Sequence, residues 1–520
     1  MKRKYEYKVL KGKVVIEINY IPVRYIIAML FAVLEIAAIM AIVIGLCYYV
    51  PYFYVAAIIT QIGCIIRIVS SDDNPDYKVP WLLVVLVIPI IGFMLYFMFS
   101  SRKLKKKYIK RLKDIHNKSY EKNDKEIVEE LEKDNLAAAN QARMITKISY
   151  SHLFKNTSVK YFPSGEQTFS SMLKDLKGAE KFIFMEYFII EEGKFWDSIL
   201  EVLKEKAKTG VEVRLVYDDI GCMTTLPGNY AKKLKSYGIE ATQFSLLRGS
   251  ADSEFNNRNH RKITVIDGKI GYTGGLNIAD EYINEKERFG HWKDNAVRLE
   301  GEAVWELTKL FLIDYGINVK YVPEYKFDCF PKVDIKAEGY VLPFGDGPRP
   351  LYEYSVGKSA IQNMLSSANK YMYMTTPYLV IDNDLCQDIE NAALRGVDVR
   401  IILPHIPDKK FVFEMTRSFY HRLMKAGVKI YEYEPGFIHA KTFISDDECA
   451  IVGTINLDYR SLVHHFENGV WMYKTGCVLE VKKDIEQTLE KCIEITEDNC
   501  KAGIFRRFIR SVMRMFAPLL

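Results

Sequence analysis

Two stretches of the sequence repeat the same polar residues at the same spacing. In each, a histidine is followed at offsets of 2, 7, 14 and 17 by lysine, aspartate, glycine and asparagine. The members are His260, Lys262, Asp267, Gly274 and Asn277 in the first copy and His439, Lys441, Asp446, Gly453 and Asn456 in the second. At background frequencies of about 0.02, 0.08 and 0.05 for His, Lys and Asp, two chance copies of the first three residues arise about once in a thousand such chains. The repetition indicates a duplicated functional unit.

An imidazole, an ammonium group and an amide from each copy suit the transfer of a phosphodiester group. Phosphorus is attacked in line, so the nucleophile and the acid that protonates the leaving oxygen must approach from opposite sides. Two histidines from halves that face each other across a pseudo-twofold interface meet this demand. The lysines, with Asn277 and Asn456 as phosphate support, would stabilise charge on the nonbridging oxygens without a metal or other cofactor.

Each motif is predicted to lie on a strand that ends in a hairpin turn. The residues after each lysine are β-branched or aromatic, and side chains two apart on a strand project from the same face. Asp267 and Asp446 complete the catalytic motif, but they lie at an odd offset before a turn. We therefore expect them to brace the turn rather than to contact substrate.

A nucleophilic imidazole is commonly held in one tautomer by a carboxylate on its other nitrogen. Asp294 and Glu467 follow the two motifs at comparable distances. We predict that each supports the histidine of the opposite half, Glu467 with His260 and Asp294 with His439. His465 lies next to this region and is interpreted as scaffold.

The elements that must position these residues also repeat. Gly210-Val-Glu-Val-Arg214 reappears as Gly396-Val-Asp-Val-Arg400, each after a helical stretch that follows an apolar, aromatic-rich run. Strand, helix, strand is the natural interpretation of both. We predict an α/β fold of two tandem repeats, residues 151–330 and 331–500, that form a pseudo-twofold body of mixed sheets flanked by helices.

The first hundred or so residues hold three apolar runs. Ile26–Val50 has one charged residue, Tyr52–Ile66 has none, and Trp81–Phe99 is nineteen uncharged residues. Only the first and third runs are comfortably long enough to cross ~30 Å of hydrocarbon. We predict a basic segment over 1–24, a transmembrane region of two to three helices over 25–100, and charged linker helices over 101–150.

Basic residues flank the apolar region on both sides, and the positive-inside rule then places both flanks, and the catalytic body, on the cytoplasmic face of a cell membrane. This requires an even number of crossings, so the middle run or the pair around Pro51 would be re-entrant or interfacial. The polybasic stretch after Ser100 suits anionic headgroups.

The last twenty residues, 501–520, form a basic amphipathic helix in this interpretation. Apolar residues recur at helical spacing with arginines between them. Two interpretations stay open for this helix, an interfacial membrane contact and a last helix packed on the soluble body.

Composition agrees with a membrane-anchored enzyme. A chain of 520 residues that is 49% apolar with a net charge of +6 is neither disordered nor a coiled coil, and it has room for two or three domains. Nine cysteines without a C-x-x-C pair indicate neither a disulfide framework nor a zinc knuckle.

The paired motifs resemble those of the phospholipase D superfamily, and the whole chain is similar to the bacterial-type cardiolipin synthases. Further stretches that resemble family landmarks are Asp73-Asn74-Pro75, Glu186-Tyr187-Phe188, Tyr217-Asp218-Asp219-Ile220-Gly221, Thr375-Thr376-Pro377-Tyr378 and Pro518-Leu519-Leu520. Two features depart from the family pattern. The run Ile26–Val50 is additional to the usual two-helix module, and Gly275 and Thr454 stand where many members have serine.

The resemblance implies transfer of a phosphatidyl group from one phosphatidylglycerol to the hydroxyl of another, which gives cardiolipin and glycerol. It implies that His260 carries the phosphatidyl group while His439 acts first as acid and then as base. Phosphatidylglycerol, cardiolipin and the lipid bilayer are the expected partners.

Other functions remain to be weighed. Hydrolysis shares the same covalent intermediate, so a membrane phospholipase D or another phosphatidyltransferase, such as one that makes phosphatidylserine, is the alternative. No nucleic-acid partner is expected, because the basic clusters flank apolar segments instead of interleaving with aromatic residues along the catalytic body. Two intact motifs disfavour a non-catalytic lipid scaffold, and the oligomeric state stays open.

Overall fold

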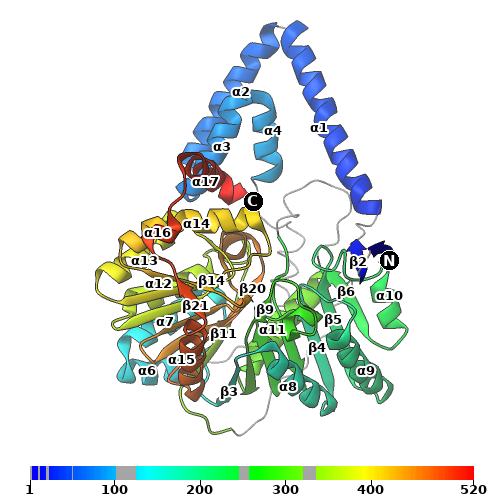
Figure 1. Ribbon diagram of the computed structural model, residues 1–520, viewed down its shortest axis with the longest axis vertical. Helices are drawn as coiled ribbons and strands as arrows, with labels where there is room; N and C mark the ends of the chain where they lie inside the picture. The colour runs from blue at the N-terminus through cyan, green and yellow to red at the C-terminus, as the bar shows by residue number, and fades with distance from the viewer. Residues whose placement is uncertain are drawn as a thin grey trace.

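Two α/β halves with the same strand order stand side by side, and a group of N-terminal helices projects from one end of them (Figure 1). This computed structural model describes residues 3–9, 12–18, 23–49, 51–100, 124–244, 257–319 and 335–519.

The first half is a seven-stranded mixed sheet with strand order β3-β10-β8-β7-β4-β5-β6. Its parallel part, β4 to β6, comes from strand–helix–strand units, and β4 is buried along its whole length because helices cover both faces. The elements are β3 (Thr157–Phe162), α8 (Gly165–Lys177), β4 (Phe182–Tyr187), α9 (Lys194–Lys208), β5 (Glu212–Asp218), α10 (Tyr230–Lys235), β6 (Glu240–Phe244), β7 (Ile263–Ile266), β8 (Ile270–Gly274), β10 (Ala296–Gly301) and α11 (Val304–Asn318).

The second half is an eight-stranded mixed sheet that repeats this order, β11-β20-β18-β17-β12-β14-β15, with β21 added at the edge. The predicted α/β fold of two repeated mixed sheets flanked by helices is therefore confirmed. The elements are β11 (Tyr340–Asp346), α12 (Val356–Ser367), β12 (Tyr371–Thr375), β13 (Leu379–Val380), α13 (Asn383–Leu394), β14 (Asp398–Pro404), α14 (Lys410–Lys425), β15 (Lys429–Tyr433), β17 (Thr442–Ser445), β18 (Cys449–Gly453), β19 (Leu457–Asp458), β20 (Glu467–Tyr473), α15 (Gly476–Leu489) and β21 (Cys492–Glu494).

The two halves exchange equivalent contacts across their interface. β9 (His291–Lys293) of the first half pairs in parallel with β16 (Gly436–Ile438) of the second. The Asn295 side chain donates to Thr442, and the equivalent Asn468 donates to Thr273 of the other half. One apolar core runs through both sheets. These reciprocal contacts are what a pseudo-twofold arrangement requires.

The segment between the apolar region and the first repeat differs from the prediction. The sequence predicts linker helices over 101–150; residues 101–123, which hold the polybasic stretch, lie outside the described residues. From there, α6 (Lys125–Asp134) and α7 (Leu136–Ser149) are part of the second half, because their apolar faces join its core. Gln141 on α7 fixes the contact by accepting from Trp471 and donating to Ser367.

The N-terminal region holds a hairpin, β1 (Arg3–Val9) with β2 (Gly12–Ile18), and four helices, α1 (Val23–Tyr49), α2 (Pro51–Ser70), α3 (Pro75–Val87) and α4 (Pro89–Phe99). Met29–Leu46 and Tyr52–Ser70 are long and apolar enough to cross a membrane, which indicates membrane anchoring.

The third apolar run, whose length alone suits a crossing, is not one continuous helix but is divided between α3 and α4. Pro89 has no N–H to donate, and a proline disfavours helical backbone at the residue before it. Ile88 accordingly has an extended φ of −128°, and α4 folds back along α3 (Figure 1).

The start of α3 is fastened to the second half. Asn74 donates to Asp382, while Asp76 accepts from the Asn383 backbone N–H at 2.7 Å and from the Tyr459 hydroxyl at 3.1 Å. The start of α3 is thus hydrogen-bonded directly to the second half.

Candidate active site

Both histidine–lysine motifs lie at the interface of the halves, directly before the central strands β7 and β17. Lys262 donates to the carbonyl oxygen of His260 at 2.6 Å, and Lys441 makes the same hydrogen bond to His439. All four side chains are nearly inaccessible to solvent. The structure therefore orders the two motifs in the same way.

Each histidine is paired with the carboxylate of the opposite half. His260 Nδ1 lies 2.9 Å and 3.0 Å from the two oxygens of Glu467, and His439 Nδ1 lies 2.7 Å from Asp294 Oδ2. This is the exchange that the sequence predicts. A carboxylate can only accept, so Nδ1 carries the proton and the lone pair is on Nε2, where it can act as nucleophile or base.

Backbone contacts between the halves set up these pairs. The His260 N–H donates to the Phe466 carbonyl, and the equivalent His439 N–H donates to the Lys293 carbonyl. Because Phe466 and Lys293 immediately precede the two carboxylates, each half positions the histidine of the other.

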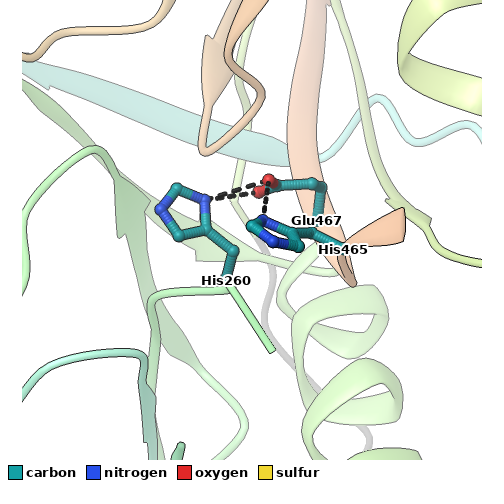
Figure 2. A group of neighbouring side chains, drawn as sticks. All are labelled: His260, His465 and Glu467. Carbon is teal, nitrogen blue, oxygen red and sulfur yellow. Dashed lines mark hydrogen bonds and ion pairs between the residues drawn. The ribbon is translucent and has the colours of Figure 1, made fainter. Parts of the chain in front are cut away.

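Glu467 has more hydrogen-bond donors around it than Asp294 has. Besides His260 it accepts from Thr454 and from Ser461 at 2.7 Å, and His465 Nδ1 lies 3.7 Å away. Figure 2 shows His260 and His465 converging on its carboxylate. Asp294 accepts only from His439 and from the Asn295 backbone N–H among the described residues. Each histidine with its carboxylate is called a dyad below. The interpretation of His465 as scaffold missed its contact with the dyad of His260 and Glu467.

The ring nitrogens of His260 and His465 and the carboxylate oxygens of Glu467 that could serve as metal ligands lie within 4.8 Å of one another. This is close enough for the group to be considered as a metal site. Glu467 already accepts hydrogen bonds from His260, Thr454 and Ser461. Glu467 is thus satisfied by hydrogen bonds, whereas both ring nitrogens of His465 are buried without a hydrogen-bond partner among the described residues. A cation bound here would have to displace the proton that joins His260 to its carboxylate.

A glycine makes room for the second dyad. A Cβ at Gly275 would overlap the Asp294 carboxylate and would lie 3.0 Å from the His439 carbonyl oxygen. The equivalent Thr454 instead donates to Glu467. The two positions at which this chain lacks the family's serine therefore suit two different carboxylates. Gly275 leaves space for Asp294, and Thr454 donates a hydrogen bond to Glu467.

The electrostatics favour neutral histidines beside ionised carboxylates. Burial lowers the pKa of His260 to about 3 and that of His439 to about 4. Burial alone would raise the pKa of each carboxyl, but the charge and hydrogen bond of the adjoining histidine hold the pKa of Glu467 and of Asp294 below its ordinary value. Near neutral pH each imidazole is therefore uncharged and hydrogen-bonded to an ionised carboxylate.

The two lysines are shifted into the physiological range. Burial lowers the pKa of Lys262 to about 7 and that of Lys441 to about 8, partly opposed by the carboxylates Glu467 and Asp294. Lys262 also lowers the pKa of His439, so its charge acts across the interface. A phosphodiester anion between the halves would favour both ammonium forms.

The surroundings of the two rings differ. His439 is enclosed by aromatic rings whose centroids lie 5.4 Å (Tyr282), 5.4 Å (Trp292) and 5.9 Å (Phe437) away. Beside His260 lie the Phe188 ring at 5.3 Å and the His465 ring at 5.6 Å, and the His465 ring is part of the polar cluster around Glu467. Phe188 belongs to a stretch that the sequence analysis names as a family landmark, whereas Tyr282, Trp292 and Phe437 follow no spacing that predicts their place beside His439.

Asp267 and Asp446 do not belong to the catalytic set. Asp267 accepts from the backbone N–H groups of residues 180 to 182 at 2.7 to 2.9 Å, and Asp446 accepts from those of residues 369 to 371 at 2.7 to 3.0 Å. Both have the left-handed backbone of a tight turn, with φ of 54° and 56°. They brace the hairpins, which is the role that the sequence analysis expects for these two members of the motif.

The two asparagines are not equivalent. Asn277 accepts from the Ile189 N–H at 3.0 Å and donates to the Tyr282 hydroxyl at 2.6 Å, so it holds the wall of the His439 site. The Oδ1 atom of Asn456 is buried without a hydrogen-bond partner among the described residues. An acceptor in this state suits a substrate hydroxyl.

Two landmark carboxylates hold the loop that carries His260. Asp218 forms a buried ion pair with Arg258 and accepts from the Asn259 N–H at 3.1 Å. The Glu186 carboxylate accepts from the Asn259 side chain. Their spacing in the sequence gives no sign of this role, because both act through residues far along the chain.

Comparisons with known proteins agree with this site. The chain matches the family described as "Cardiolipin synthase, PLD-like domain" over residues 172–307 and 361–492, and the family "Phospholipase_D-nuclease N-terminal" over residues 59–100. It is 36% identical over 381 residues to a cardiolipin synthase of Alkalihalophilus pseudofirmus, covering 73% of this chain and 75% of that protein. It is 38% identical over 362 residues to a cardiolipin synthase of Geobacillus kaustophilus, covering 69% and 71%. An uncharacterized protein of Streptococcus mutans is 44% identical over 407 residues, covering 78% and 87%.

Among solved structures, the phosphatidylserine synthase of Haemophilus influenzae has the same fold. It aligns with a TM-score of 0.56 at 15% identity and covers 73% of this chain and all of that one.

Proposed function

Because this chain belongs to the cardiolipin synthase family of the phospholipase D superfamily and is a phosphatidyltransferase, we propose that it joins two phosphatidylglycerol molecules into cardiolipin and releases glycerol. The observation that carries the proposal is the reciprocal pairing of His260 with Glu467 and of His439 with Asp294. It supplies two neutral imidazoles, one from each half.

In the first step, Nε2 of His260 attacks the phosphorus of one phosphatidylglycerol. A P–N bond forms, the P–O bond to the headgroup glycerol breaks, and His439 gives a proton to the departing oxygen. The imidazole of His260 gains positive charge as the bond forms, and Glu467 stabilises that charge. The bound phosphodiester offsets the two lysine charges, which favours the protonated His439 that this step needs.

In the second step, His439 takes a proton from a hydroxyl of the second phosphatidylglycerol. The freed oxygen attacks phosphorus, the P–N bond breaks, and His260 returns to its starting state. In the transition state of both steps the nonbridging oxygens of the phosphoryl group carry negative charge, which Lys262 and Lys441 stabilise. Protons and bonds balance over the cycle without a cofactor.

The role of His260 as nucleophile rests on the family resemblance and is supported by its surroundings. Glu467 is fixed by Thr454 and Ser461 as well as by His260, which suits a ring that must hold one orientation through a covalent intermediate. The aromatic enclosure of His439 suits a proton carrier from which water is excluded.

The cell membrane is the proposed location. Crossings by α1 and α2 alone would make an even number and keep the basic flanks, and with them the catalytic body, on the cytoplasmic side. Lipid substrates would then reach the site from the adjoining leaflet.

Product analysis tests the proposal. Purified full-length protein is incubated with phosphatidylglycerol labelled in its headgroup glycerol, and the lipid and aqueous products are quantified. We expect cardiolipin and free glycerol in equal amounts, and loss of both in the His260→Ala variant. Phosphatidic acid as the main product would show a phospholipase D instead, and a phosphatidylserine product with added serine would show a different transferase.

A further inference from the structure

The C-terminal helix α17 (Ile504–Phe516) is attached to the protein by its charged face. Arg506 and Arg510 both donate to Glu414 on α14, at 3.0 Å and 2.9 Å through their Nε atoms. The Arg514 guanidinium lies 4.3 Å from the ring centre of Phe419, also on α14. These three arginines are spaced four residues apart, so they form one stripe that faces the catalytic body.

The apolar face of the same helix points away from the body. Five of its residues are exposed, namely Ile504 (88%), Phe505 (76%), Phe508 (65%), Ile509 (40%) and Val512 (38%). A helix packed on a soluble domain has the opposite arrangement, with its apolar stripe inward. The helix therefore does pack on the soluble body, as one of the two interpretations of the sequence has it, but it does so mainly through its arginines and leaves these five apolar residues outward.

The neighbours of α17 indicate what covers its apolar face. α17 and the 3-10 turn that follows it, Ala517–Leu519, both contact α3, and Figure 1 shows α17 beside the base of the apolar helices. The outward residues of α1 and α2 are likewise apolar and exposed. The exposed face of α17 thus continues the surface by which the chain is anchored.

We propose that α17 is an interfacial helix that inserts its apolar face into an anionic leaflet and seats the second half of the body on the membrane. Exposed Arg507 flanks the apolar face and would reach lipid phosphates. The stripe of Arg506, Arg510 and Arg514 attaches the membrane-bound helix to α14. The proposal concerns how the body is held and does not depend on the reaction it catalyses.

Site-specific photo-crosslinking tests the contact in the full-length protein. A photoreactive phenylalanine analogue replaces Phe508 in protein reconstituted into nanodiscs of phosphatidylglycerol and phosphatidylcholine, and adducts are identified by mass. The same probe at Leu479, an exposed apolar residue (58%) on α15, is the matched control, because Figure 1 shows α15 at the opposite end of the second half from α17. A probe at Ile59 on α2 is the positive control.

We expect lipid adducts at residue 508 within about threefold of those at residue 59, and at least tenfold above those at residue 479. Anionic discs should give more adduct at residue 508 than discs of phosphatidylcholine alone. A probe at Phe505 repeats the measurement at a second position in case substitution at Phe508 perturbs the helix. Adducts to protein instead of lipid, or lipid adducts no more frequent than at residue 479, would overturn the proposal.

Discussion

At the scale of single residues, the two histidines have the same hydrogen-bonding geometry but different support. Glu467 receives hydrogen bonds from Thr454 and Ser461 in addition to His260, whereas Gly275 leaves space in which Asp294 meets His439. Two motifs with one spacing have therefore become two sites with different surroundings, as expected where one ring bonds to phosphorus and the other moves protons.

Replacing the carboxylate of either dyad should slow the reaction without removing the histidine. In Glu467→Gln and in Asp294→Asn an amide remains to accept from Nδ1, but it cannot stabilise the positive charge that each ring gains. We expect kcat to fall about 10² to 10⁴-fold in each variant. Asp498→Asn, an exposed carboxylate in the C-terminal segment, is the control. Near wild-type kcat in both dyad variants would contradict the assigned roles.

The lysines should set the alkaline limit of activity. Their ammonium forms are the active ones, and the pKa values of Lys262 and Lys441 are lowered to about 7 and about 8. We therefore expect kcat/KM to fall more steeply as pH rises above about 7, where loss of the lysine charge adds to the loss of the protonated His439 that the first step needs. The corresponding fall in kcat should lie at higher pH, because bound phosphodiester favours the charged lysine. With the histidine pKa values at about 3 and about 4, no acid limb should appear above pH 5. A kcat/KM that rises between pH 7 and pH 9 would contradict this.

The space at Gly275 can be filled to test the second dyad alone. Gly275→Ala would press its Cβ against the Asp294 carboxylate and move it away from His439. We expect overpacking to cost about 1–3 kcal/mol in folding free energy and activity to fall about tenfold or more. Gly476→Ala is the matched control, since no atom lies within 4 Å of its added Cβ. Full activity in Gly275→Ala, with the substitution verified, would show that the Asp294 position is not required.

At the scale of elements, the start of α3 forms a direct joint between the membrane helices and the catalytic half. Asp76 accepts from both Asn383 and Tyr459, and Tyr459 precedes the short helix Arg460–His464 that carries Ser461 to Glu467. The joint thus lies one short helical segment from the His260 dyad.

Weakening the hydrogen bonds of Asp76 should destabilise the start of α13 locally. In Asp76→Asn the acceptor loses its charge, and hydrogen bonds to charged groups are worth about 1.5–3 kcal/mol. We expect amide hydrogen exchange at residues 383–386 to quicken about tenfold or more, together with a several-fold loss of activity. The exposed Asp72 gives the matched control variant, Asp72→Asn. Unchanged exchange in Asp76→Asn would show that the contact does not hold the elements together.

Sequence patterns predicted some elements and missed others for physical reasons. The strand and turn around each motif were predictable, because side-chain alternation and turn residues are local properties. The crossed carboxylate pairs followed from the need to orient an imidazole. The break at Pro89 was overlooked because the apolar length of 81–99 dominated the interpretation, although the proline itself was the signal. The role of α6 and α7 could not be seen, because only their packing on the second sheet shows that they are not a linker.

At the scale of the whole molecule, duplication explains both the fold and the chemistry. Two sheets of the same order exchange backbone and side-chain contacts, so neither half contains a complete histidine–carboxylate pair of its own. Membrane helices and the C-terminal helix lie at one end of this body (Figure 1). The proposed lipid substrates and the proposed water-soluble product, glycerol, fit a body that is anchored in this way.

Trapping a covalent intermediate on His260 tests whether both halves act on a single phosphorus. The His439→Asn variant is incubated with phosphatidylglycerol labelled in the phosphate, denatured at alkaline pH to preserve phosphohistidine, digested and analysed by mass spectrometry. We expect a phosphatidyl group on His260 that forms slowly in this variant, which lacks the acid of the first step, but persists, because the base of the second step is also missing. The group should be absent from His260→Ala. Label on another residue, or transfer that continues in His260→Ala, would contradict this expectation.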